Sequence, residues 1–361
     1  LTRYIAQGTL WKMGDMFQLS VELYDTRGKK VVWSDRWQEK WDNLPTIKGS
    51  LSDGLLKALD TKPKVEQKID TTNTEAYEFY LKAKHKYEKR ENTNDTEIAR
   101  GLLKKAIELD DTLITAKVLL GWTYSEMGDY DEAMEIYTPA LKQAEEIGDK
   151  VGMGISLNNI GNVHQFQGDY DKALDNYGRS LAIREELGDK SGMVYSLNNI
   201  GIVHYNKGDY EKALDYYNRS LAIQEEIGDK RGMGFSLYSI GIVHSNKGDY
   251  DKALDYLEKS LAIQKEIGIK AIELETTTYL YLCYRHLSMD YDEKHLHSLI
   301  KDAENIEFEL NFRLYQLLDD TSYLETAYKQ VQEKASEMEE ETGKTFLGYS
   351  LPTAIVEEWD K

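Results

Sequence analysis

The tripeptide Gly-Asp-Tyr recurs along this chain at a fixed interval of 40 residues. It stands at residues 128–130, 168–170, 208–210 and 248–250, and the residues around it repeat almost unchanged. A fixed period of this length is typical of a solenoid, in which each unit buries its apolar face against the next one. The repeat therefore predicts a mainly α-helical chain, an α-solenoid built from helix-turn-helix units.

The repeat that begins at residue 191 shows the pattern of two helices joined by a short turn. Its first half spaces apolar residues at helical intervals from Met193 to Val203. Gly208 then ends the helix, since glycine takes the left-handed conformation without strain. Asp209 is a suitable N-cap for the second helix, which continues to Gly228.

Each first helix has a glycine near its middle, and each second helix has an alanine twelve residues later. A glycine inside a helix costs about 0.5–1 kcal/mol relative to alanine. The cost is explained if these small residues let the two helix backbones approach closely. We therefore predict contacts between Gly121 and Ala133, Gly161 and Ala173, Gly201 and Ala213, and Gly241 and Ala253.

The first 70 residues carry a different pattern. Apolar and polar residues alternate strictly from Phe17 to Leu23, which predicts a half-buried strand. Turn residues on either side predict three antiparallel strands, at 4–13, 16–25 and 30–38. A helix follows Pro45. Roughly 60 residues bury only a marginal core, and the chain opens at Leu1 without methionine, so we expect a partial α+β domain cut from a longer protein.

Two stretches resemble known families. Residues 72–312, with Leu/Ile–Gly, Gly-Asp-Tyr and Ala at fixed offsets, resemble the tetratricopeptide repeat, in the longer 40-residue form found in scaffold proteins that bind peptides. The stretch YIAQGTLWKMGDMFQLSVELYDTRGKKVVWSDRW resembles the second half of the TolB amino-terminal-like domain. In bacterial signalling proteins that non-catalytic domain sits between an output domain and a repeat array. The resemblance implies an adenylate or guanylate cyclase or a kinase domain upstream of Leu1.

These patterns divide the chain into four parts. We expect the partial domain at 1–61, a linker at 62–73, the solenoid at 74–312, and capping helices with a tail at 313–361. The repeats cover about 74–110, 111–150, 151–190, 191–230 and 231–270, and a degenerate repeat follows at 271–312. Decay of the pattern is expected in a terminal unit, because its outer face meets water. The tail is expected from Phe346 to Lys361.

The net acidic charge of the chain lies beyond residue 70. Residues 1–70 carry 12 Lys and Arg against 10 Asp and Glu, whereas the remainder carries 33 against 54, a balance of −21. Such a surface repels phosphate backbones, which argues against nucleic acid, and attracts a basic protein or peptide. No apolar run approaches the 18 residues that a membrane span needs. We expect a cytoplasmic location, or a periplasmic one if a transmembrane helix precedes this segment.

Candidate catalytic and metal-binding residues are few. His164, His204 and His244 recur once per repeat, but neighbouring helices lie roughly 8–10 Å apart, too far for three nitrogens to share a zinc ion at about 2 Å. His295 and His297 point to different faces of a helix. No activated nucleophile or phosphate-binding glycine loop accompanies the many carboxylates. We therefore expect no metal, no cofactor and no catalytic residue; an enzyme with an unrecognised carboxylate site is the alternative.

In the tetratricopeptide family the first helix of each repeat lines a concave groove. The corresponding positions here are uncharged amides and aromatics, which suit the backbone and side chains of an extended peptide. The resemblance implies a peptide-binding set of Trp122, Asn158, Asn162, Gln165, Tyr195, Asn198, Tyr205, Asn206, Tyr238 and Asn246. Packing against neighbouring helices is the alternative reading for each of them.

Together these features favour a non-catalytic interaction module that binds a peptide or protein partner, as the regulatory or scaffolding part of a bacterial signalling protein. The second hypothesis is a receptor that captures a short signalling peptide and controls an upstream cyclase or kinase domain in cis. Both hypotheses place recognition on the groove.

Overall fold

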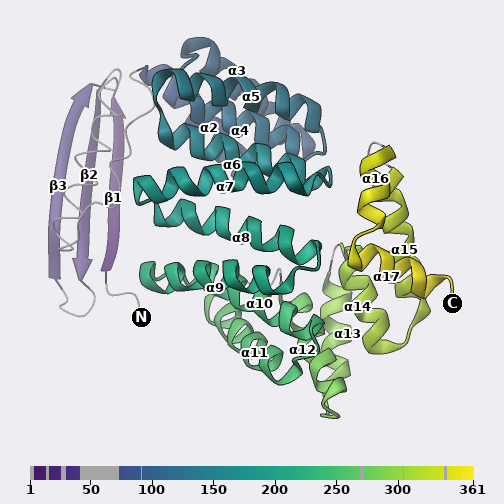
Figure 1. Cartoon of the computed structure of the whole chain (residues 1–361). Coiled ribbons are helices and arrows are strands. Elements are labelled where there is room, and N and C mark those ends of the chain that lie inside the picture. The colour runs from purple at the N-terminus through teal and green to yellow at the C-terminus, as the bar shows by residue number, and fades with distance from the viewer. Residues whose placement is uncertain are drawn as a thin grey trace. The chain divides into compact units, whose positions relative to one another are not determined.

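The computed structural model describes residues 4–13, 16–25, 30–40, 73–90, 92–268, 272–303, 305–336 and 340–361 (Figure 1). These ranges contain three strands and sixteen helices, α2 to α17, so the predicted mainly helical class is confirmed. The helix expected after Pro45 and the linker expected at 62–73, apart from Asn73, lie outside the described residues. A search of the described helices finds none that is both long and apolar enough to cross a bilayer.

The three strands form one antiparallel sheet in chain order: β1 (Tyr4–Met13), β2 (Met16–Asp25) and β3 (Lys30–Lys40). Leu19 pairs with Trp37 across β2 and β3. Val21 and Leu23 are buried, whereas Glu22 between them is exposed, as the alternating pattern predicts. The predicted three-stranded meander is therefore confirmed, and β3 continues two residues further than expected.

The chain divides into two compact units, residues 1–159 with 187–189 and residues 160–186 with 190–361. The helices of the first unit are α2 (Thr74–Glu88), α3 (Thr93–Leu109), α4 (Ile114–Ser125) and α5 (Tyr130–Ile147), each packed against the next. Their core is rich in alanine, with Ala76, Ala83, Ala106 and Ala116 fully buried. Small side chains let these helices pack closely. Helix α6 (Lys150–Phe166) runs from the first unit into the second.

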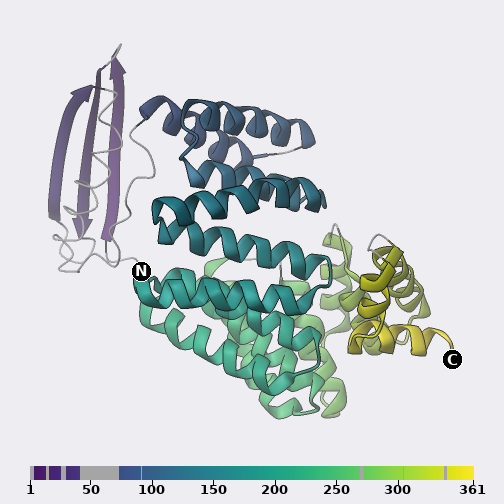
Figure 2. The same ribbon diagram turned by 45° about the horizontal axis from the view of Figure 1, so that its top comes forward.

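The second unit continues the repeats with α7 (Tyr170–Leu187), α8 (Lys190–Asn206), α9 (Tyr210–Ile227), α10 (Lys230–Asn246), α11 (Tyr250–Ile267) and α12 (Glu273–His286). These helices lie side by side in chain order in both views (Figure 2). The last five helices are α13 (Glu293–Asp302), α14 (Phe308–Leu318), α15 (Thr321–Ser336), α16 (Glu340–Leu347) and α17 (Ser350–Trp359). From α8 to α12 each helix packs on the next one in sequence, which is the arrangement of a tetratricopeptide-type solenoid.

The Gly-Asp-Tyr turn has the conformation that its sequence predicts. Gly208, just after α8, has a φ of +76°, a left-handed conformation in which any Cβ would be strained. The Asp209 carboxylate accepts a hydrogen bond of 3.4 Å from the backbone N–H of Lys212 in the first turn of α9. Gly168 and Gly248 repeat the positive φ, so the turn recurs with the sequence period.

The glycines inside the first helices lie closest to a large side chain of the second helix, a tyrosine ring at Gly121, Gly161 and Gly201 and Leu257 at Gly241, where the carbonyl of the predicted Ala253 follows at 3.4 Å. A Cβ built on Gly201 would lie 2.6 Å from Cε1 of Tyr217, and one built on Gly161 would lie 2.6 Å from Cε1 of Tyr177. The predicted partner Ala213 is itself buried, but the Tyr217 ring contributes the nearest atoms. The prediction of close packing is confirmed, but the nearest partner is the tyrosine or leucine of the second helix and not the alanine, because that larger side chain fills the space that the missing side chain leaves.

The C-terminal residues, which we expected to form a tail, are helical over most of their length. Helices α14–α17 share a core of Phe312, Leu324, Ala327, Val331, Phe346 and Ile355. Ile355 is fully buried, four positions after Leu351, so the segment has a helical apolar stripe. Pro352 stands in the first turn of α17, where its missing N–H costs no intrahelical hydrogen bond.

Candidate functional site

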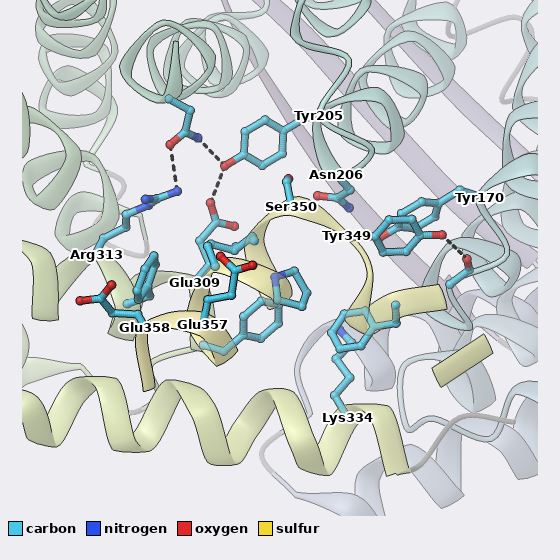
Figure 3. Close-up of a pocket in the computed structure, with 18 of the residues that line it drawn as sticks. Tyr170, Tyr205, Asn206, Glu309, Arg313, Lys334, Tyr349, Ser350, Glu357 and Glu358 are labelled. Carbon is cyan, nitrogen blue, oxygen red and sulfur yellow. Dashed lines mark hydrogen bonds between the residues drawn. The ribbon is translucent and has the colours of Figure 1, made fainter. Parts of the chain in front are cut away.

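A cavity of about 500 Å³ lies within the second unit, between its repeats and its C-terminal helices (Figure 3). The repeats contribute Gln165, Phe166, Gly168, Tyr170, Tyr205, Asn206, Tyr210 and Asn246. The C-terminal helices contribute Phe308, Glu309, Phe312, Arg313, Gln316, Lys334, Phe346, residues 349–352, Ala354, Glu357, Glu358 and Lys361. Its volume falls in the range of roughly 300–1,000 Å³ that is usual for ligand sites.

The 40-residue period places the repeat wall of this cavity. Phe166, Asn206 and Asn246 are the same position of three successive repeats, in the last turn of α6, α8 and α10. Gln165 and Tyr205 are the position before it in two of them. Stacked repeats place equivalent positions side by side. The last turns of α6, α8 and α10 therefore form one continuous wall.

A hydrogen-bond network joins this wall to α14 at one end of the cavity. The Glu309 carboxylate accepts from the hydroxyls of Tyr205 at 2.7 Å and Tyr279 at 2.6 Å. The Asn246 amide donates to the Tyr205 hydroxyl at 2.8 Å, and its oxygen accepts from the Arg313 guanidinium at 2.8 Å. Burial, followed by the charge of Glu309, raises the pKa of both tyrosines well above the usual value, so both remain donors.

Tyr349, just before α17, closes the other end. Its ring stacks on Tyr170 with centroids 4.4 Å apart and an interplanar angle of 22°. Its hydroxyl donates a hydrogen bond of 3.0 Å to the backbone carbonyl of Gly168. Figure 3 shows this pair at one side of the cavity and Arg313 with Glu309 at the other. Tyr170, covered in this way, is only 7% exposed.

Charges of both signs line the cavity. Lys361 pairs with Glu358 at 2.8 Å, and Glu358 also accepts from the Tyr315 hydroxyl at 3.0 Å. The Lys334 ammonium lies 5.6 Å from the centroid of the Phe308 ring, within cation–π range. Over the ranges that the structure describes, no group of three or more His, Cys, Asp or Glu side chains could hold a metal ion. The lining suits recognition of a polar ligand by hydrogen bonds and aromatic contact.

Four of the ten predicted groove residues line the cavity: Gln165, Tyr205, Asn206 and Asn246. They come from α6, α8 and α10, as the repeat positions imply. Each is partly exposed.

The other six residues do not line it. Asn162 accepts from the Tyr177 hydroxyl at 2.8 Å and from the Asn199 amide at 3.0 Å, so it joins helices within the repeats. Asn198 accepts from the Ser236 hydroxyl at 3.4 Å, and Tyr238 donates to Glu275 at 3.0 Å. Tyr195 is 66% exposed on α8. Trp122 and Asn158 belong to the first unit, and both are partly exposed.

The opposite wall, above all Glu309, Arg313 and Tyr349, was not predicted from the sequence. These residues follow the last recognisable Gly-Asp-Tyr and have no equivalent in the period. The one available signal was the helical spacing of Leu351, Ile355 and Trp359, which indicates a packed helix but not what it packs against.

Family models of the tetratricopeptide repeat match residues 112–186 and 193–266, and a second model of the same repeat matches residues 158–226. A search of the curated proteins finds no match.

Three solved structures show a similar fold at low sequence identity. The apo form of RapI is 17% identical, with a TM-score of 0.54 over 79% of this chain and 99% of that one. A Rap protein complexed with Competence and Sporulation Factor is 17% identical, with a TM-score of 0.52 over 86% and 82%. A signal-transduction ATPase (STAND) protein with a tetratricopeptide repeat sensor from Pyrococcus horikoshii is 18% identical, with a TM-score of 0.54 over 78% and 43%.

Proposed function

We propose that this chain, whose residues 112–266 are tetratricopeptide repeats, is a non-catalytic interaction module that binds an extended segment of a peptide or protein in the cavity of its second unit. The observation that carries the proposal is the wall made by Gln165, Asn206 and Asn246 with the tyrosines around them. Amides offer donors and acceptors to a peptide backbone, and aromatic rings offer surfaces to its side chains.

The dimensions and charge of the site support a short segment as the ligand. A cavity of about 500 Å³ is large enough for a few residues of a chain, not for a folded domain. Its lining holds three cationic and three acidic side chains, namely Arg313, Lys334, Lys361, Glu309, Glu357 and Glu358. The net charge of −21 beyond residue 70 would steer a basic partner toward the repeats before it docks.

A second candidate function is a receptor in which a short signalling peptide controls an upstream cyclase or kinase domain in cis. The similar Rap structure is complexed with Competence and Sporulation Factor, and the similar STAND protein carries its repeats as a sensor. The TolB-like resemblance of residues 4–37 and a cytoplasmic location belong to this proposal as well. The receptor function uses the same cavity as the interaction module. The two functions differ only in what the bound ligand controls.

The test compares two double variants of the full chain, after the partner has been captured from the source cell and purified. Gln165→Ala with Asn206→Ala removes two amides from the cavity. A neutral hydrogen bond contributes about 0.5–1.5 kcal/mol, so losing two should weaken binding roughly five- to 150-fold. The control, Asn158→Ala with Asn198→Ala, removes two amides of the predicted set that do not line the cavity.

Loss of affinity in the cavity variant alone supports the proposal. Loss in the control alone would place recognition elsewhere on the first helices, and unchanged binding in both would move it to the convex face or the loops. Urea unfolding of each variant checks that stability is retained, because the Tyr177 hydroxyl donates to Gln165 at 2.9 Å.

A further inference from the structure

We infer that Tyr349 is a latch: it occupies an aromatic slot on the repeats in cis, and a peptide partner opens the cavity by placing an aromatic side chain of its own there. The slot consists of the Tyr170 ring and the Gly168 carbonyl, which Tyr349 contacts by stacking and by its hydroxyl. The inference rests on the proposed function and adds the regulation and the partner class of that site.

The C-terminal helices are attached to the repeats through α14. One side of α14 places Leu310, Leu314 and Leu317 in the core formed with α10, α11 and α12. The other side places Phe312 in the separate core of α15–α17. Helix α14 therefore holds the C-terminal helices on the repeats through both cores, so opening concerns Tyr349 and the turn that carries it, not the position of α15–α17.

At the far end, Tyr349 and Ser350 bring the same helices into contact with the repeats. Among the apolar side chains that the structure describes, Tyr349 is the one that packs against both the core of α14–α17 and the core of α7 and α8. Next to it, Ser350 Oγ lies 3.9 Å from the position of a Cβ built on Gly208. Glu309 and Arg313 of α14 make further hydrogen bonds between the two walls, to Tyr205 and to Asn246. Opening this end moves Tyr349 away from Tyr170, which removes the stack, the hydrogen bond to Gly168 and the packing of Tyr349 on the core of α7 and α8, and leaves α14 in both of its cores.

A closure of this strength can be displaced by a ligand. An aromatic stack and a neutral hydrogen bond together shift an equilibrium by roughly five- to 150-fold. A partner that binds only the open form has its apparent affinity lowered by this five- to 150-fold factor. A partner that itself stacks on Tyr170 and donates to the Gly168 carbonyl recovers most of the lost affinity. A segment that presents tyrosine is therefore the partner of best fit, and one that presents phenylalanine keeps the stack alone.

The first experiment measures the latch without any ligand, by hydrogen–deuterium exchange of the full chain. Tyr349→Ala should speed exchange roughly five- to 150-fold across residues 166–170 and 346–359, with α10–α12 unchanged. Tyr349→Phe, which keeps the stack, should show a smaller change. The matched control is Tyr328→Ala, which removes a stack on Trp359 at 5.1 Å inside the C-terminal helices and should leave residues 166–170 unaffected.

The second experiment tests the partner class with a labelled synthetic peptide that copies residues 346–353, Phe-Leu-Gly-Tyr-Ser-Leu-Pro-Thr. Fluorescence anisotropy should show binding to Tyr349→Ala roughly five- to 150-fold tighter than to the wild type. The same peptide with alanine in place of its tyrosine should not bind either protein.

Unchanged exchange at residues 166–170 in Tyr349→Ala would overturn the latch, and equal binding of the peptide to both proteins, or to neither, would overturn the aromatic slot. These outcomes are independent of the Gln165 and Asn206 variants, which test the proposed function alone.

Discussion

Replacing Gly201 by alanine adds one methyl group where the ring of Tyr217 meets the backbone of α8. The new Cβ would lie 2.6 Å from Cε1, 2.8 Å from Cδ1 and 3.0 Å from Cζ of that ring. Carbon atoms in good contact are about 3.5–4.0 Å apart, so the ring or the helix must move. Tyr217 is 2% exposed and packs with Leu214 and Ile240, so it has no free space to enter.

Two effects of opposite sign decide the result. Alanine improves helix propensity over glycine by about 0.5–1 kcal/mol, whereas overpacking a core costs about 1–3 kcal/mol. The free energy of unfolding should therefore fall by up to about 2.5 kcal/mol. Gly178→Ala is the matched control, because Gly178 lies exposed in α7 and a Cβ there meets no atom within 4 Å. Only propensity acts at that site, so the control should be stabilised by about 0.5–1 kcal/mol.

Urea unfolding followed by circular dichroism measures both variants, with native-state hydrogen exchange of α8 and α9 as a local readout. The local readout is needed because neighbouring repeats can unfold separately from distant ones. If Gly201→Ala stabilised the chain as much as Gly178→Ala, the Tyr217 ring would not close that space, and the explanation of the recurring glycine would be wrong.

Two further predictions concern pH. Burial raises the pKa of Glu275, so the folded state disfavours its ionised form, and this group's contribution to stability is lost as pH rises above its usual pKa of 4.5. Glu275→Gln keeps an acceptor for the Tyr238 hydroxyl and should raise the urea midpoint at about pH 7 but not at about pH 4; a lower midpoint at pH 7 would contradict this. Burial lowers the pKa of His204, although the charge of Asp209 opposes this effect. The folded state therefore disfavours the protonated ring, and the contribution of His204 to stability is lost as pH falls below its usual pKa of 6.5. His204→Gln should flatten the loss of thermal stability between about pH 7 and about pH 5, and an unchanged slope would show that His204 does not contribute.

Much of the fold follows from local patterns in the sequence. The positive φ of Gly208, the cap made by Asp209 and the apolar spacing of α8 and α9 were all predictable, because each depends on residues within a few positions. The repeat wall of the cavity was predictable for the same reason, since the period carries Asn206 and Asn246 to equivalent places. Which amides would be engaged by neighbours was not predictable. Asn162 and Asn198 occupy groove positions yet accept hydrogen bonds from within the solenoid.

The sequence by itself thus determined the helix-turn-helix repeat, its 40-residue register and the class of residue on its inner helices. Only the tertiary structure decided that the chain's own C-terminal helices form the second wall of the cavity. The contacts that build this wall join residues far apart in the chain: Tyr205 is 104 residues from Glu309, and Gly168 is 181 residues from Tyr349. Such contacts depend on how two packed surfaces fit and on which polar groups they remove from water, and no periodic pattern records either property.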